Sequence, residues 1–245
     1  MDSRFTNPAA PPWLPFESRR RARDEKREAV LRTAVQLFLE QGYHRVTLNE
    51  VAERLNITKP ALYNYFRGKD EILFECWSMG AELVDSVIAE IDAGGGSGIV
   101  KLRKLVHAYA EVMAIDFGAS IVRFDVRDLT NRNARIARAA KKRIDATFRA
   151  YITAGIADGS IKRCDAKLAA FAIAGSLNWI GHWYQRDGAL SPGEIADEFT
   201  VRLTEGLAAK PAQGHTTTKT APVARTATRE ARRKATGKKR GGASR

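Results

Sequence analysis

Apolar residues recur along the chain at helical spacing, and no segment shows the strict alternation that is typical of a half-buried strand. The first such segment covers residues 24–41 and ends at Gly42, a residue that readily adopts the left-handed backbone of a helix stop. Its expected buried stripe consists of Val30, Ala34, Leu37 and Phe38. The spacing therefore predicts a helix over residues 24–41.

Two shorter helices follow, and each has a start signal. The hydroxyl of Thr47 can cap the first, and Glu50, three residues later, can complete a capping box. After a tight connection, Thr58 can cap the second helix, and Pro60 falls in its first turn, where a missing N–H is tolerated. The inner faces are expected to carry Val51, Leu55, Leu62 and Phe66.

The rest of the chain is predicted to be helical over residues 69–91, 99–115, 119–129, 131–157, 165–186 and 192–208. Gly94–Gly98 is expected to be a flexible linker, because it follows no strand and therefore does not fit a phosphate-binding loop. About nine helices in total predict an all-α protein. We expect a flexible basic arm at 1–23, a three-helix domain at 24–69, a larger helical domain at 70–208 and a disordered basic tail at 209–245.

Residues 47–66 have the anatomy of a helix-turn-helix, with the small Ala52 where the two helices must cross closely. The second helix is expected to expose hydrogen-bonding groups and flat rings from Thr58, Lys59, Tyr63, Asn64 and Tyr65. Solvent alone would favour Glu and Lys there, so this face points to base recognition in the major groove of double-stranded DNA. Between Arg19 and Lys69 the chain holds 12 Lys/Arg and 6 Asp/Glu, which favours contact with phosphates.

The formal charge of +13 is carried mostly by the C-terminal tail, since residues 210–245 hold 11 Lys/Arg and one acidic residue. The tail is expected to be disordered, and to act either as a solubilising end or as a non-specific DNA contact. Arg19–Arg23 is either a solvated arm or a contact to DNA phosphates. No stretch approaches a membrane span and the first residues lack the order of a signal peptide, so we expect a cytoplasmic protein without membrane contact.

The sequence offers no pattern for catalysis or for metal binding. Cys76 and Cys164 lie far apart without a CxxC motif, and His44, His107 and His182 are isolated from clustered acids. No catalytic triad or carboxylate pair is recognisable either. We therefore expect no enzyme activity, no metal and no cofactor.

The segment around the helix-turn-helix resembles the tetracycline-repressor (TetR) family of bacterial transcription regulators. The matching residues are Ala34–Phe38, Gly42–Tyr43, Thr47–Ala52 and Lys59–Leu73. The resemblance implies that base edges or nearby sugar-phosphates are met by Lys59, Pro60, Tyr63, Asn64 and Tyr65, and that phosphates are clamped by Thr47 and Lys69. It also implies that residues 70–208 bind a small-molecule effector and form a homodimer on a palindromic operator.

Residues 177–184 and 187–196 resemble a subgroup of TetR-type repressors that answer to acyl-CoA or other CoA thioesters; a multidrug-responsive efflux repressor is the alternative. An acidic, partly apolar effector suits Phe117, Arg123, Phe124 and Arg127, because guanidinium groups bind phosphate. The alternative for the two arginines is surface pairing with the adjacent Asp125 and Asp128. A second patch serves either the effector or helix packing, and consists of Asn178, Trp179, His182 and Trp183. Because the family's last two helices form a four-helix dimer interface, where small residues allow close approach, we expect that interface at Ala170, Ala174, Leu177, Gly181, Tyr184 and Phe199.

Two hypotheses of different classes remain open. In the first, an effector releases a repressor from its operator, and the helix predicted from Lys69 is the lever between the two domains. In the second, the chain is a sequence-indifferent architectural DNA-binding protein. Deleting residues 210–245 separates them, because only the architectural protein needs the basic tail for binding.

Overall fold

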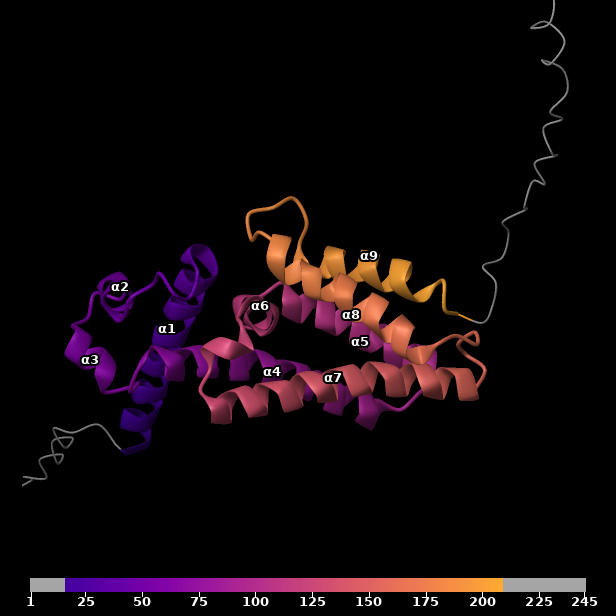
Figure 1. Cartoon of the computed structure of the whole chain (residues 1–245), viewed down its shortest axis with the longest axis horizontal. Coiled ribbons are helices and arrows are strands. Elements are labelled where there is room, and N and C mark those ends of the chain that lie inside the picture. Colours follow the sequence, from indigo (N-terminus) through magenta and orange to yellow (C-terminus); the bar gives the residue numbers. More distant parts are fainter. Residues whose placement is uncertain (1–15, 209–245) are drawn as a thin grey trace, which may run out of the picture. The chain divides into compact units, whose positions relative to one another are not determined.

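The structure is a computed structural model that describes residues 16–208, and all regular elements in this range are helical (Figure 1). They are α1 (Phe16–Gln41), α2 (Leu48–Arg54), α3 (Lys59–Tyr63), α4 (Lys69–Gly94), α5 (Gly98–Met113), α6 (Asp116–Arg123), the 3-10 helix η1 (Val126–Asp128), α7 (Asn131–Ala157), α8 (Ala166–Trp183) and α9 (Pro192–Thr204). Within that range β-type pairing is limited to one bridge between Ile161 and Ala208. The expected all-α fold is confirmed.

Several boundaries differ from the expectation, most of all the start of α1 and the helix expected at 119–129. Helix α1 begins at Phe16, eight residues earlier than predicted, so the expected flexibility was wrong for residues 16–23. These residues are good helix formers but almost entirely polar, and they give no amphipathic pattern to detect. The predicted helix at 119–129 is divided into α6 and η1, with Asp125 capping η1 through the N–H of Arg127. Residues 1–15 of the arm and the basic tail at 209–245 lie outside the described residues.

The predicted helix ends around α2 and α3 are confirmed. The Thr47 hydroxyl accepts from the N–H of Glu50 at 3.3 Å, and the Glu50 carboxylate accepts from the N–H of Thr47 at 2.5 Å. Thr58 caps α3, and Pro60 lies in its first turn. Gly42 ends α1 with a φ of 89°, which is left-handed backbone.

The predicted glycine linker is a short turn rather than a flexible connection. Gly94 still belongs to α4 and Gly98 already belongs to α5. The N–H of Gly98 donates to the Asp158 carboxylate at 2.7 Å, and the N–H of Ile99 donates to the Ser160 hydroxyl at 3.1 Å. These bonds tie the turn to the end of α7, which the sequence pattern did not indicate.

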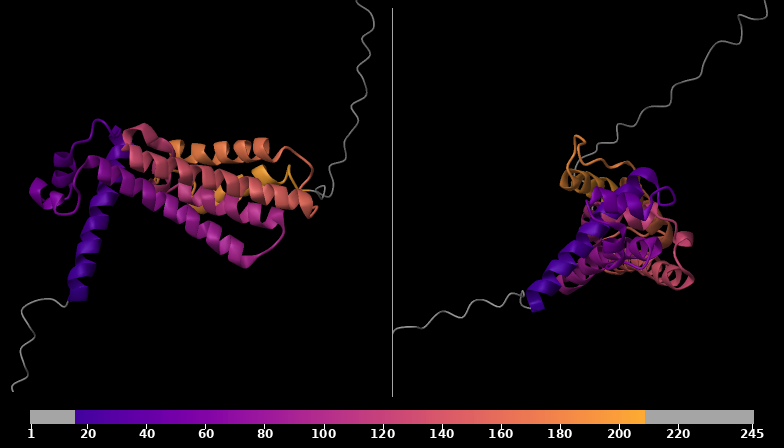
Figure 2. Two further views of the ribbon diagram at one scale, coloured as in Figure 1. Left: turned by 60° about the horizontal axis from the view of Figure 1, so that its bottom comes forward. Right: turned by 90° about the vertical axis from the view of Figure 1, so that its left-hand side faces the viewer.

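The helices from α4 onward are packed around α5, which contacts α4, α6, α7, α8 and α9 (Figures 1 and 2). Its inner side chains Leu102, Leu105 and Met113 are fully buried, and the ring of Tyr109 meets the edge of Phe148 at 5.5 Å. Among the described residues no single helix is both long and apolar enough to cross a membrane; α5 and α6 meet that criterion only as a pair bent by 93°.

Helix α1 joins the N-terminal helices to the rest of the fold. Its C-terminal half contacts α2, α4 and α6, whereas its N-terminal half projects away from the other helices (Figure 2). The Phe38 ring of α1 meets the Phe124 ring, just after α6, at 6.0 Å. The Arg123 guanidinium donates to the Leu39 carbonyl, and His44 lies 3.0 Å from the Asp128 carboxylate. These three contacts fix the C-terminal end of α1 against the segment Arg123–Asp128.

Gly118 of α6 marks the closest backbone approach between α5 and α6. A Cβ atom at this position would lie 1.7 Å from the Val112 carbonyl oxygen. We predict that Gly118→Ala lowers the free energy of unfolding by about 1–3 kcal/mol, because the two helix backbones must separate. Urea unfolding followed by circular dichroism measures the change.

The matched control is Gly193→Ala in α9, where a Cβ atom would meet nothing within 4 Å. It should leave stability unchanged or raise it by roughly 0.5–1 kcal/mol, since alanine restricts the unfolded chain. Equal midpoints for the two variants would contradict the close approach at Gly118.

Candidate DNA-binding surface and effector cavities

Helices α2 and α3 are held in place from their buried sides. Ala52 of α2 and Leu62 of α3 are buried, and Phe66, just after α3, is 1% exposed. Asn56 in the connecting turn adopts a φ of 52°, a left-handed conformation that Asn tolerates better than most residues. The N–H of Ile57 donates back to the Ala52 carbonyl at 3.0 Å. The result is a rigid two-helix unit with one face in the core.

The opposite face of α3 is open to solvent. Its exposed side chains are those of Thr58, Lys59, Pro60, Tyr63 and Asn64. Tyr63 is 48% exposed, although it is a large aromatic residue. Tyr65 was expected on this face as well, but it is half-buried against the core because it lies beyond the end of α3. The structure therefore brings five of the six predicted recognition residues to one exposed surface.

The two predicted phosphate contacts differ in their surroundings. Thr47 is exposed at the start of α2. Lys69 is half-buried at the start of α4, with its ammonium 4.3 Å from the centre of the Tyr43 ring. Burial lowers the pKa of Lys69, while the carboxylates of Glu50 and Asp128 act in the opposite direction. Lys69 thus stands beside the α2 capping box at the rim of the exposed surface.

The projecting half of α1 adds positive charge next to this surface. Arg20, Arg21, Arg23 and Lys26 are all exposed. Arg27 instead folds back, pairing with Glu75 of α4 and lying 4.8 Å over the Phe66 ring. One arginine of α1 therefore holds the end of the helix-turn-helix against α4, and the preceding ones are available to phosphates.

The residues expected to bind an effector do not form a single site. Phe117 and Phe124 are each 7% exposed and pack where α1, α4 and α6 meet. Arg123 is bonded to the end of α1, as described above. Arg127 makes two hydrogen bonds to the Asp125 carboxylate and holds the pKa of that group at about 2. Both arginines are thus occupied by groups of the chain itself.

A partly open cavity of about 130 Å³, called the internal cavity below, lies among α5, α6, α7 and α8. It is lined by Tyr109, Ile121, Val122, Lys141, Ile144, Asp145, Phe148, Ala174 and Asn178. The Tyr109 hydroxyl donates to the Asn178 side-chain oxygen at 2.8 Å, and burial raises the pKa of Tyr109. Only Asn178 among these residues was predicted to meet an effector. The others come from four separate helices, and no local spacing reveals that they converge.

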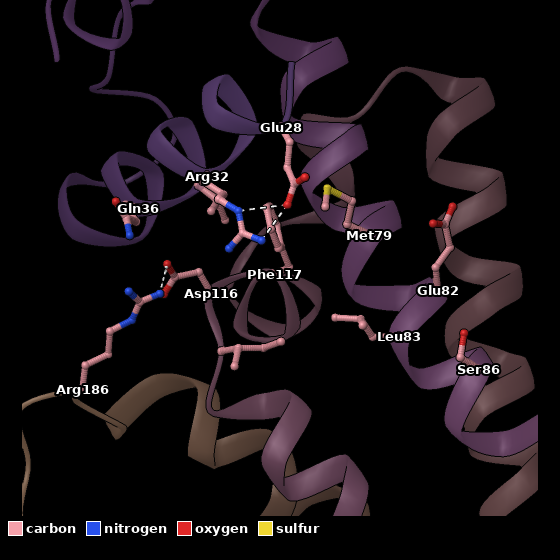
Figure 3. Close-up of a pocket in the computed structure, with 12 residues that line it drawn as sticks. Glu28, Arg32, Gln36, Met79, Glu82, Leu83, Ser86, Asp116, Phe117 and Arg186 are labelled. Carbon is pink, nitrogen blue, oxygen red and sulfur yellow. Dashed lines mark hydrogen bonds and ion pairs between the residues drawn. The ribbon is translucent and has the colours of Figure 1, made fainter. Parts of the chain in front are cut away.

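Two larger hollows lie beside α1. The first, of about 760 Å³, has α1, α4 and α6 as its walls, with Leu83 and Phe117 facing it (Figure 3). An ion pair of 2.6 Å between Asp116 and Arg186 stands at the border with the second, of about 730 Å³. That second hollow brings together three predicted effector residues, Arg123, His182 and Trp183. Trp179 is 61% exposed, and its ring stacks on that of His182 with 5.0 Å between the ring centres.

The residues expected at the dimer interface lie within the protomer. Ala170 and Leu177 are fully buried, and Ala174 lines the internal cavity. The remaining three pack inward too: Gly181 is buried next to Ala119, while Tyr184 and Phe199 are half-buried against the core. The burial of Ala170, Leu177 and Gly181 leaves little of their surface for a second copy, and the expected interface stays a prediction. Helix α8 is apolar on more than one side, so periodicity does not reveal which side faces inward.

A different side of α8 is apolar and exposed. This α8 outer face consists of Leu168, Phe171, Ala172, Gly175, Trp179 and Trp183. Leu168 is 64% exposed and Phe171 49%, and a Cβ atom at Gly175 would meet nothing within 4 Å. Exposed apolar patches of this kind usually mark an interaction surface.

Two family models match the chain. The model described as "Bacterial regulatory proteins, tetR family" covers residues 30–76, and the one described as "Tetracyclin repressor-like, C-terminal domain" covers residues 95–207. The helix-turn-helix and the helices that contain the internal cavity thus both match models of the same family.

The chain is also similar to curated transcriptional regulators and to solved structures. The chain is 21% identical over 196 residues to the HTH-type transcriptional repressor KstR2 of Mycolicibacterium smegmatis, covering 74% of this chain and 90% of the relative. The structure of KstR2 of Mycobacterium tuberculosis is similar with a TM-score of 0.70 and 18% identity, over 75% of this chain and 95% of that one. The structure of AibR in complex with isovaleryl coenzyme A and operator DNA is similar with a TM-score of 0.64 and 23% identity. The match covers 73% of this chain and 98% of that one.

The capping box of α2 generates a prediction about Thr47. Thr47→Ala removes the acceptor for the N–H of Glu50 and should lower the free energy of unfolding by about 1 kcal/mol. Thr47→Ser keeps the acceptor and should stay close to the original stability. Urea unfolding of both variants tests the cap, and equal loss in both would contradict it.

Proposed function

Because the chain belongs to the tetracycline-repressor family of bacterial transcriptional regulators, we propose that it is a repressor whose homodimer holds operator DNA until a small-molecule effector binds. The observation that supports this most strongly is α3, a capped helix with Leu62 in the core and Tyr63 and Asn64 in solvent. In a two-fold dimer, two such helices enter successive major grooves about 34–36 Å apart. The operator is therefore nearly palindromic.

The exposed residues divide into two roles on DNA. Lys59, Tyr63 and Asn64 lie where α3 enters the groove, and their ammonium, hydroxyl and amide groups suit base edges. Thr47 and Lys69 at the rim contact phosphates, together with the arginines of the projecting half of α1. Phosphate contacts fix the register, and base contacts supply the specificity.

The occupant of the α8 outer face is a second copy of this chain. The apolar residues recur along nearly the whole of α8, from Leu168 to Trp183, which suits a long helix packed against its symmetry mate. Ala172 and Gly175 stand in the middle of the face, where small side chains let two backbones approach. The interface thus lies on the side of α8 opposite to the one expected from the sequence.

The effector is an acyl-CoA thioester. AibR, which has a similar fold, was crystallised in complex with isovaleryl coenzyme A and operator DNA. The internal cavity of this chain is mostly apolar and is bordered by α6, whose end is bonded to α1 through Arg123. An occupant that displaces α6 moves α1 and the recognition helices with it. A coupling of about 1–3 kcal/mol would weaken operator binding roughly 5- to 150-fold.

Tyr63→Ala tests the placement of α3. Operator sites are first selected from random duplexes with the unaltered protein, and affinities are then measured by fluorescence anisotropy. The variant should lose about 1–3 kcal/mol of specific binding, because a contact to base edges is removed. Its unfolding midpoint should not change, since the ring is half exposed.

Binding to an unrelated duplex provides the internal control, because phosphate contacts supply it and Tyr63→Ala leaves them intact. Equal loss on both duplexes, or no loss on either, would show that Tyr63 reads no bases.

Trp179→Glu tests the dimer. A buried, unpaired carboxylate within the α8 outer face should convert the dimer into a monomer, measured by size-exclusion chromatography with light scattering. The matched control is Ile136→Glu on α7, an exposed apolar position at 45% exposure outside that face, which should remain dimeric. A Trp179→Glu protein that stays dimeric would place the interface elsewhere.

A further inference from the structure

The N-terminal half of α7 carries a concentration of positive charge that neither the DNA-binding surface nor the dimer interface uses. From Arg132 to Arg143 the chain has six Lys/Arg and no acidic residue. Five of them are exposed, and the four that remain after Arg143 is set aside form what we name the α7 basic face: Arg132, Arg135, Arg138 and Lys142. Like charges one turn apart destabilise a helix, so a bound anion would stabilise this segment.

The α7 basic face has no internal counter-charge among residues 16–208. Arg143 pairs with Asp85, but the four residues of the face make no ion pair within that range. This distinguishes them from Arg127 and Arg149, which are paired with Asp125 and Asp145. Unneutralised arginines bind phosphate well, because the guanidinium donates two parallel hydrogen bonds.

Lys141 connects the internal cavity to this face, because it lines the cavity and lies one helical turn from Arg138 and next to Lys142. Lys141 lines the cavity and is only partly exposed. Its neighbouring carboxylates, Asp125 and Asp145, already hold arginines, so its charge is not neutralised by an ion pair among the described residues. Burial lowers the pKa of Lys141, with Asp125 opposing the change. An anion at this point would relieve the desolvation of the ammonium group.

The positions on α7 form a continuous path away from the cavity. Lys141, Arg138, Arg135 and Arg132 follow one another at intervals of three residues, which places each about 4.5 Å further along the helix axis. Each step also turns about 60° around the axis, so a ligand leaving the cavity past Lys141 meets Arg138 first and Arg135 next, and Arg132 lies about half a turn around the helix from Lys141. Figure 1 shows α7 among the helices of the larger domain, separate from α2 and α3, so the path is distinct from the recognition surface.

The size of the internal cavity limits the length of the apolar end of the ligand. Its volume of about 130 Å³ equals that of roughly four liquid waters, and Ile121, Val122, Ile144 and Phe148 make most of its wall apolar. Tyr109 and Asn178 supply a polar pair inside it. This space suits a short acyl group of a few carbon atoms and is too small for a long acyl chain.

We propose that the effector is a short-chain acyl thioester of CoA, with its acyl group in the internal cavity, its first phosphates at Lys141 and its remaining phosphates on the α7 basic face. This inference rests on the proposed function and specifies its ligand and its site. The cavity selects for the length of the acyl group. The contacts to the CoA phosphates supply most of the binding affinity.

The experiment measures release of the full-length protein from its selected operator. Isobutyryl-CoA is titrated against the unaltered protein and against the triple variant Arg135→Gln, Arg138→Gln, Lys142→Gln. The triple variant should need at least about 10-fold more isobutyryl-CoA for release of half of the bound protein, because charge-assisted bonds to phosphate are lost. S-isobutyryl-pantetheine, which lacks the phosphates, should act weakly and equally on both proteins, and palmitoyl-CoA should act more weakly than isobutyryl-CoA on the unaltered protein.

The matched control is Lys162→Gln, Arg163→Gln, which removes two exposed positive charges from the connection between α7 and α8. It should respond to isobutyryl-CoA like the unaltered protein. Without ligand, the triple variant should bind the operator as tightly as the unaltered protein does.

The outcomes that overturn the inference are distinct. If no CoA thioester releases the unaltered protein, the proposed effector class is wrong and the inference fails with it. If isobutyryl-CoA releases the unaltered and triple-variant proteins equally, the site is wrong but the effector class stands. A triple variant with weakened operator binding in the absence of ligand would assign the α7 basic face to DNA, and a preference for palmitoyl-CoA would exclude the small cavity as the acyl site.

Discussion

The recognition helix depends on the burial of one side, because α3 has only five residues and a helix of this length is not stable by itself in water. Leu62 and Phe66 supply that burial, and Arg27 of α1 covers the Phe66 ring while pairing with Glu75 of α4. The side chains that face solvent, such as that of Tyr63, therefore contribute little to stability. Their position is set by the packing of α3 on α2 and by the contacts of α1 with α2 and α4, so a shift of α1 moves the DNA-binding surface.

The same dependence explains how a distant cavity can control DNA binding. Ile121 and Val122 of α6 line the internal cavity, and the next residue, Arg123, donates to the backbone of α1 at Leu39. Phe124 then packs against Phe38 of α1. Four consecutive residues thus reach from the effector cavity to the helix that supports α3. Because tightly packed interiors move as units rather than deforming smoothly, a displacement of α6 is passed on to α1.

The features that could be predicted from the sequence are those encoded by neighbouring residues. The capping box of Thr47 and Glu50, the stop at Gly42 and the exposure of Tyr63 all follow from local spacing, and the structure has each of them. The orientation of α8 could not be predicted, since Leu177 and Trp179 belong to different apolar sides of one helix and only packing against other helices selects the buried side. The start of α1 was missed because its charged residues carry no amphipathic pattern.

The arginines show why the proposed effector site could not be predicted from the sequence alone. Arg127 suits phosphate as well as Arg135 does by residue type, yet Arg127 is bonded to Asp125, two residues before it, whereas the charges around Arg135 have no acid within the run. Residue type alone is therefore a poor guide to an anion site; the useful criterion is a positive charge that the fold leaves without a partner. In this chain α7 meets that criterion, and it is also the helix that forms a wall of the internal cavity through Ile144 and Phe148. A positive charge without an ion-pair partner among the described residues and a mostly apolar cavity wall meet at Lys141, and a ligand that is anionic at one end and apolar at the other suits both.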